Sequence, residues 1–256
     1  MKTYGPIIYS TTDADKPISG ICENFSYKDA QTLTEVMDLG EIVALIAHGR
    51  KGILSFSSTP ANGVTALGVR AGNELTLTTS STSDMDTASV AGGKIIVTNS
   101  SAKWQRGQPM VMEGQATHLP SLSSTTVGAI TAATLNRSGG NGSIVTPTDK
   151  VWWGVSGLTA GSGGIPAGIL QSCTIGESIQ LMEEEDQTGA IIAAILHGYK
   201  ATLSLEVNSS ASIDTLVGST VTAFTNFLCQ EAEVKSTKGA LRTIMLTGIC
   251  VPGVTS

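Results

Sequence analysis

The sequence predicts a mainly β protein made of two tandem, similar β-sandwich or barrel domains, each with at most one short helix. Three observations support this fold class. The chain repeats itself once, its apolar segments are short and often alternate with polar residues, and Gly punctuates those segments. Alternation is the period of a strand that has one face on a core and one face in water.

The internal repeat is the strongest of these observations. A shift of 149 positions (189 minus 40) superimposes residues 39–51 on residues 188–200 without a gap. The turn positions that it pairs are Gly40, His48, Gly49 and Lys51 in the first repeat, and Gly189, His197, Gly198 and Lys200 in the second. Further on, residues 69–76 resemble 215–222, and residues 110–116 resemble 244–250. We therefore expect domains at residues 1–119 and 150–256, joined by a Ser/Thr/Gly-rich linker at 120–149, and the composition allows two cores.

The individual strands follow from the apolar pattern. Residues 42–47 and 191–196 are apolar on both faces and are bounded by Gly, which favours strands buried on both sides. Gly49 and Gly198 are then expected to close hairpins into the alternating segments 51–57 and 200–207. Further strands are predicted at residues 73–78, 94–98, 109–116, 220–224 and 243–250, and short helices at residues 61–69 and 212–218.

Composition and charge limit the function. The chain has 41% hydrophobic and only 14% charged residues, so its surface is largely Ser, Thr and Gly, which is typical of a surface that meets another protein. The net charge of −6 supplies no basic footprint for nucleic acid. The first residues do not resemble a signal peptide, and no apolar run approaches membrane-spanning length, so we expect a cytoplasmic site of synthesis.

Catalytic, metal and cofactor motifs are absent from the sequence. Two of its three histidines are the duplicated His48 and His197, and no nucleophile elbow, zinc-protease or phosphate-loop pattern occurs. The four cysteines form no CxxC pair and are interpreted as small buried hydrophobic residues. We expect no catalytic residues, no metal and no cofactor.

The strongest charge feature is the acidic run Glu183, Glu184, Glu185 and Asp186, which the 149-residue shift aligns with a segment that keeps only Glu35. The run could bind a divalent cation, or it could be a solvated strand end before the turn at Gly189. The structural interpretation is favoured, because carboxylates on a strand point alternately to opposite faces. These five residues are the candidates for assembly or lumen electrostatics.

The order of these segments resembles the tail tube proteins, or major tail proteins, of bacteriophages. In both repeats a strand ends in Glu, and a Gly turn, an apolar strand, a His-Gly-x-Lys turn and an alternating strand follow. The resemblance covers about the first half of each repeat. It implies β-sandwich or barrel domains in six-fold rings that stack into a tube, through which the genome passes at infection. Two domains per chain would then give a trimeric ring with pseudo-six-fold symmetry.

The resemblance also implies partners and a location. The chain would bind itself and other tail proteins (the tape measure, terminator and distal tail proteins), and it would reside in the virion tail after assembly in the bacterial cytoplasm. DNA would cross the lumen without specific binding, which suits an acidic protein.

Other functions stay open at this stage. A duplicated β protein could be another virion component, such as a tail-completion, decoration or fibre-attachment protein, or the tube of a secretion or contractile injection system. A hydrolase or sugar-binding module is a further alternative, although aromatic residues make up only 4% of the chain.

Overall fold

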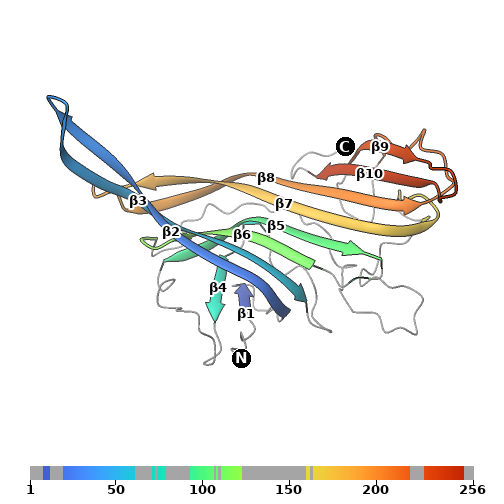
Figure 1. The fold of residues 1–256 in the computed structure, drawn as a ribbon, viewed down its shortest axis with the longest axis horizontal. Coiled ribbons are helices and arrows are strands. Elements are labelled where there is room, and N and C mark those ends of the chain that lie inside the picture. Colours follow the sequence, from blue (N-terminus) through green and yellow to red (C-terminus); the bar gives the residue numbers. More distant parts are fainter. Residues whose placement is uncertain are drawn as a thin grey trace.

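A computed structural model describes residues 8–11, 20–60, 71–72, 74–78, 93–106, 108, 111–122, 160–161, 164–219 and 228–250. In these residues the chain forms one antiparallel sheet of ten strands and no helix, which confirms the mainly β prediction (Figure 1). The strands are β1 (Ile8–Thr11), β2 (Gly20–Asp38), β3 (Glu41–Pro60), β4 (Glu74–Thr78), β5 (Lys94–Gln105), β6 (Val111–Leu119), β7 (Ile169–Glu185), β8 (Ile191–Asn208), β9 (Leu228–Lys235) and β10 (Thr243–Cys250).

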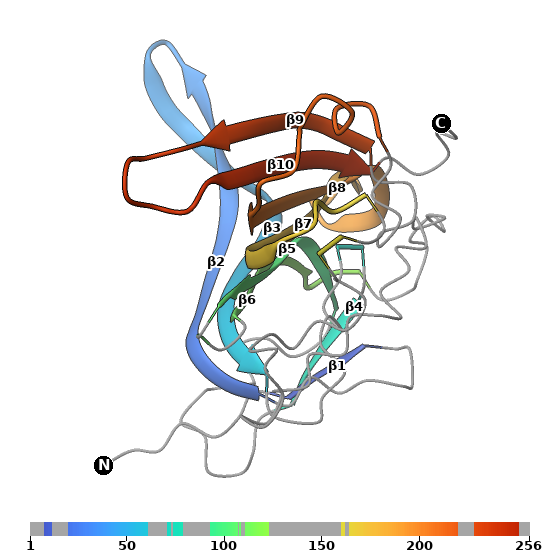
Figure 2. The same cartoon turned by 90° about the vertical axis from the view of Figure 1, so that its right-hand side faces the viewer.

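The strand order repeats within the sheet. Its main path is β2-β3-β6-β5-β7-β8-β10-β9, in which the first four strands belong to the first repeat and the last four to the second. Each half has the same order, and β5 joins the halves by pairing antiparallel with β7. The short strands β1 and β4 pair with each other, and β4 also pairs with the first residues of β5. The part of the sheet formed by the first repeat is therefore strongly curled (Figure 2).

The irregularities of the two halves also coincide. In the β2–β3 pair the register shifts after Cys22, Ala30 and Val36. In the β7–β8 pair it shifts after Leu170, Ser178 and Glu184, each 148 positions later (170 minus 22). The single shift of the β5–β6 pair, after Val97, recurs at Cys229 in the β9–β10 pair, 132 positions later (229 minus 97). Because bulges are specific features of a fold, their coincidence shows that both halves have the same backbone plan.

The register corrects the sequence alignment. Strand β8 follows β3 by 149 positions, as predicted, but β7 follows β2 by 148 and β10 follows β6 by 132 rather than 134. The cause of the first difference is the hairpin turn. Asp38 and Glu41 enclose two residues, whereas Asp186 and Ala190, joined by a backbone hydrogen bond of 2.9 Å, enclose three. The structural equivalent of Glu35 is therefore Glu183, not Glu184.

A second correction concerns Gly49 and Gly198, which do not close hairpins. Strand β3 runs without a break through residues 41–60, and Gly49 and Arg50 together lie opposite the single residue Gln31. Gly49 has φ of 62° and Gly198 has φ of 64°, the left-handed conformation that the first residue of such a bulge adopts. The His-Gly-x-Lys segment therefore bends one long strand and does not separate two short strands.

The remaining predictions divide into three groups. Strands near residues 73–78, 94–98, 109–116 and 243–250 are confirmed as β4, β5, β6 and β10, while β1 and β9 were not predicted. Residues 212–218 contain turns, so the helix predicted there is wrong. The strand at 220–224, the helix at 61–69 and most of the linker lie outside the described residues. The resemblance of residues 69–76 to 215–222 is confirmed at its glycine, because Gly72 N donates to Val97 O and Gly218 N donates to the equivalent Cys229 O.

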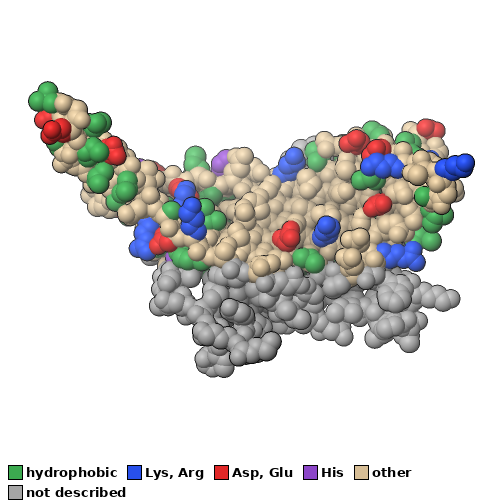
Figure 3. Space-filling view, viewed as in Figure 1, with side chains coloured by type: hydrophobic (Ala, Val, Ile, Leu, Met, Phe, Trp, Pro, Cys, Tyr) green, Lys and Arg blue, Asp and Glu red, His purple; other side chains and the backbone are tan. Residues whose placement is uncertain are grey.

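The buried hydrophobic residues of the described part form one cluster that includes both repeats, from Leu54 and Ile96 in the first to Leu205 and Ile244 in the second. The outer half of the β2–β3 hairpin extends beyond this core as an arm, residues 30–47 (Figures 1 and 3). Every arm residue is exposed, including the large apolar side chains Leu33, Met37, Ile42, Leu45 and Ile46. The prediction that residues 42–47 and 191–196 are buried on both sides is therefore wrong, because the first segment is exposed and the second is buried on one face only. A two-stranded hairpin is marginally stable in water, so this arm calls for a partner.

The bulge glycine offers a test of the backbone account. In Gly198→Ala the new Cβ meets no atom closer than 3.5 Å, so only the left-handed backbone opposes it. We expect a loss of about 1–2 kcal/mol in the free energy of unfolding, measured with urea. Gly198→Asn is the matched control, because Asn tolerates this conformation, and it should recover part of the loss. Equal stability of wild type and Gly198→Ala would contradict the bulge.

Candidate functional site

The joint between the two repeats is the most specific construction in the molecule. Strand β5 pairs with β7 from Asn99 opposite Ser178 to Gln105 opposite Ser172. Ala102 and Ile175 lie opposite each other and are both buried. The buried Glu177 accepts hydrogen bonds from the Ser100 hydroxyl at 3.4 Å and from the Ala71 amide at 3.3 Å. The joint therefore combines a backbone ladder, apolar packing and a satisfied buried carboxylate.

Beyond this ladder, the tip of the β7–β8 hairpin contacts the bulge of β3 in the first repeat. Gly49 N donates to Gly189 O at 2.9 Å, and Lys51 Nζ lies 2.9 Å from Glu183 Oε2. A side chain on Gly189 would place its Cβ 2.5 Å from the Cβ of His48. Only glycine permits this close approach, so the tip and the bulge fit each other through two duplicated glycines.

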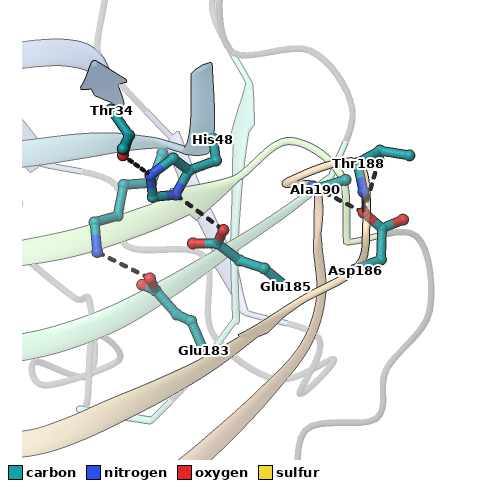
Figure 4. Close-up of polar contacts among 8 residues, drawn as sticks. Thr34, His48, Glu183, Glu185, Asp186, Thr188 and Ala190 are labelled. Carbon is teal, nitrogen blue, oxygen red and sulfur yellow. Dashed lines mark hydrogen bonds and ion pairs between the residues drawn. The ribbon is translucent and has the colours of Figure 1, made fainter. Parts of the chain in front are cut away.

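His48 connects three elements at the same place (Figure 4). Its Nδ1 lies 3.1 Å from Glu185 Oε2 and its Nε2 lies 3.0 Å from Thr34 Oγ1. Since a carboxylate only accepts, Nδ1 donates to Glu185, and in the neutral imidazole Nε2 accepts from the threonine hydroxyl. A hydroxyl, an imidazole and a carboxylate in this order also form the nucleophile, base and orienting group of many hydrolases, so this relay is the one chemically suggestive cluster that we find in the described residues.

The acidic run is divided by strand alternation. Glu183 and Glu185 point to the first repeat, where they contact Lys51 and His48, while Glu184 lies exposed on the other side. Within the described part of the chain, no group of three or more His, Cys, Asp or Glu side chains could hold a metal ion.

Asp186 organises the turn that follows. Its Oδ1 accepts hydrogen bonds from the Thr188 hydroxyl at 2.6 Å, the Thr188 amide at 2.8 Å and the Ala190 amide at 3.1 Å (Figure 4). These bonds, the Thr188 hydroxyl first, lower the pKa of Asp186 below its usual value.

The remaining candidate residues from the sequence repeat are exposed to solvent. Glu35 and Gly40 on the arm, and His197, Gly198 and Lys200 on β8, are all exposed. The first-repeat bulge is thus covered by the second-repeat tip, whereas the first-repeat tip and the second-repeat bulge are both uncovered. Sequence reasoning proposed these positions but missed Thr34, whose equivalent in the second repeat is Met182.

A further pair missed by sequence reasoning lies beside the bulge. Arg50 Nε and Nη2 donate to Asp29 Oδ2 at 3.0 and 2.5 Å. The hydrogen bonds from Arg50 lower the pKa of Asp29. Asp29 is the structural equivalent of Glu177, and the 148-residue shift that relates them is the only signal that links them.

One face of the sheet is concave and carries mainly polar residues. An open hollow of about 750 Å³ lies over strands β2, β3, β6, β5, β7 and β8. The cross-strand registers place small polar residues in rows across it. One row is Ser26, Ser55, Gln115, Asn99, Ser178 and Lys200; the next is Asn24, Ser57, Glu113, Ser101, Gly176 and Thr202. This surface mixes hydroxyl and amide groups with few charges.

The turn carboxylate predicts an acid dependence. Because the pKa of Asp186 is lower in the folded than in the unfolded chain, its stabilisation is complete above the unfolded pKa of about 3.9 and is lost as the pH falls through the folded value. Asp186→Asn should therefore destabilise the protein more at pH 7 than at pH 3, by urea unfolding. Thr188→Ala, which removes the first of the three donors, should show a smaller effect with the same sign. A stability difference that is independent of pH would contradict the assignment.

No helix among the described residues combines the length and the apolar character needed to cross a membrane. No protein family model and no curated protein sequence matches the chain.

Proposed function

We propose that this chain is a structural protein that assembles with itself into three-chain rings, and that the rings stack into a hollow tube of the bacteriophage tail tube kind. The observation that carries the proposal is the state of the two outer strands of the sheet. In the described residues β2 pairs only with β3, and β9 pairs only with β10. Edges of this length that have no partner strand in the described part of the chain invite pairing with another chain.

The two outer strands are complementary because of the repeat. Strand β9 is the equivalent of β5, and β2 is the equivalent of β7, so the pair that joins the repeats inside the chain is available again between chains. Transferring the β5–β7 register places Glu233 of one chain opposite Lys28 of its neighbour, and Val234 opposite Tyr27. Opposite charges and apolar pairs at facing positions both stabilise a sheet. The contact is head-to-tail, which closes into a ring when the rotation permits.

Stacking needs a surface that ring closure leaves uncovered in both repeats. Val43 and Ile46 on the arm are exposed, and so are their equivalents Ile192 and Ile195. Ring closure covers equivalent surfaces of each repeat, so an apolar face exposed in both repeats is free for contact with the next ring.

The polar face of the sheet suits the wall of a conduit. Lys200 is the one basic residue among the described residues that line this face, and the chain has a net charge of −6, so DNA phosphates meet no extended basic surface. As a tail component the chain would reside in the virion after assembly in the host cytoplasm, would need no cofactor, and would also bind tape measure, terminator and distal tail proteins.

The Thr34–His48–Glu185 relay supports a second candidate, a hydrolase. Three features weigh against it. Thr34 lies on the exposed arm, the concave surface described above includes none of the three residues, and the second repeat has Met182 in place of Thr34. If the relay were catalytic, Thr34→Val would abolish an esterase activity of the purified protein. We expect no such activity to lose.

The proposal predicts the effect of charges at the free edges. Wild-type protein, concentrated and viewed by negative-stain electron microscopy, should form rings of three chains and stacks of rings. Lys28→Glu and Glu233→Lys each place like charges opposite one another and should lower ring formation in sedimentation velocity. The double variant Lys28→Glu/Glu233→Lys restores the opposite charges and should recover rings.

Lys103→Glu is the matched control, since it makes the same charge change on an inner strand opposite Thr174, away from both edges. Rings of six chains, a closed dimer, or a discrete monomer at every concentration would overturn the proposed function.

A further inference from the structure

We infer that the β2–β3 arm of one chain seats on the second repeat of the neighbouring chain, at the bulge formed by residues 197–200, and that an ion pair between Glu35 and Lys200 fixes it there. This inference rests on the proposed ring assembly and adds to it a second contact, separate from the edge strands. Its basis is a contact that the molecule already makes once, within the chain, between the β7–β8 hairpin and the bulge of β3.

Each polar residue of the contact within the chain has an equivalent residue at the inferred contact between chains. Inside the chain Lys51 Nζ contacts Glu183 Oε2 at 2.9 Å. The equivalent of Lys51 is Lys200 and that of Glu183 is Glu35, so lysine and glutamate recur with the same roles. The backbone bond from Gly49 N to Gly189 O has its counterpart in Gly198 N and Gly40 O, and all four glycines have positive φ.

The apolar part is exposed on the arm and buried in its counterpart. Ile191 and Ala194 of the β7–β8 hairpin are 0% exposed, whereas their equivalents Ile42 and Leu45 on the arm are 52% and 60% exposed. Leu33, the equivalent of the half-buried Leu181, is exposed as well. The same face of the same hairpin is therefore covered in one repeat and bare in the other.

The receiving surface shows the same asymmetry. In the first repeat Ala71 is buried, and a Cβ on Gly72 would lie 3.4 Å from Ile179 and 4.0 Å from Leu196 of the β7–β8 hairpin. In the second repeat the equivalent Val217 is 57% exposed, and a Cβ on Gly218 would meet nothing within 4 Å. Both halves of the missing contact are thus present on one molecule, at sites that only a second copy of this chain can bring together.

The histidine contact differs between the joint within the chain and the inferred contact between chains. His48 meets the carboxylate of Glu185 inside the chain, but the equivalent of Glu185 on the arm is Met37, which would face His197. The contact between chains therefore keeps the lysine–glutamate pair and replaces the imidazole–carboxylate pair with an apolar group.

Zero-length carbodiimide coupling tests this directly, because it links an amine and a carboxylate only where they touch. Mixed unlabelled and ¹⁵N-labelled protein is assembled, coupled, digested and analysed by mass spectrometry. The Lys51–Glu183 link inside the chain is the internal positive control and should appear in every sample. The Lys200–Glu35 link should appear only after assembly, and half of it should join a labelled to an unlabelled peptide.

Charge variants provide the second arm of the test. Glu35→Lys should raise the concentration needed for assembly several-fold, and Glu35→Lys/Lys200→Glu should restore it. Glu41→Lys is the control, since the equivalent of Glu41 is Ala190, which has no lysine partner.

The outcomes separate this inference from the proposed function. Rings that give the Lys51–Glu183 link but no mixed-isotope Lys200–Glu35 link would overturn the seating of the arm and leave ring assembly intact. Absence of any assembly would overturn both.

Discussion

The antiparallel ladder between β5 and β7 is the interaction on which the rest of the molecule depends. It joins the strands of both repeats into one sheet, lets both repeats share a core, and brings the tip of the second repeat to the bulge of the first. Because a backbone ladder is made of groups that every residue carries, the joint needs little sequence identity between the repeats. It needs only a matched strand order and matched bulges, and these are the features that the two halves have in common.

The β5–β7 pair forms once within the chain, and its equivalents β9 and β2 lie at the two outer edges of the sheet. Each edge can therefore pair with the opposite edge of another chain. In the single chain the arm is the least stable part of this arrangement, because it is a two-stranded hairpin whose Ile, Leu and Met side chains are exposed to water. In a monomer this arrangement would be a liability for aggregation. In a closed head-to-tail ring each surface is covered by its own complement, and the apolar face that stays exposed in both repeats is available to the next ring.

Some of this could be predicted from the sequence, because duplication and alternation are local patterns. The β class, the equivalence of β3 with β8 and that of Gly72 with Gly218 follow from such patterns. The equivalence of β2 with β7 could not be predicted in this way, since one extra residue in the turn before Ala190 shifts the alignment by one position. Identities such as that of Glu35 with Glu184 in the unshifted alignment therefore arise by chance. A bulge glycine and a hairpin glycine both favour positive φ, so Gly49 was assigned to the wrong structure. The contacts of Glu183 and Glu185 depend on how the repeats meet, which no local pattern records.

The central claim is that the joint inside the chain is formed again between chains. Hydrogen exchange of backbone amides, compared between dilute and assembled protein, measures this most directly. The account predicts that the outward-pointing amides of residues 24–30 of β2 and of β9, which do not bond to β3 or β10, exchange quickly in the dilute protein. After assembly they should be protected to the level of residues 172–178, whose amides form the same ladder within the chain. Assembly that protects other surfaces while β2 and β9 still exchange quickly would contradict it.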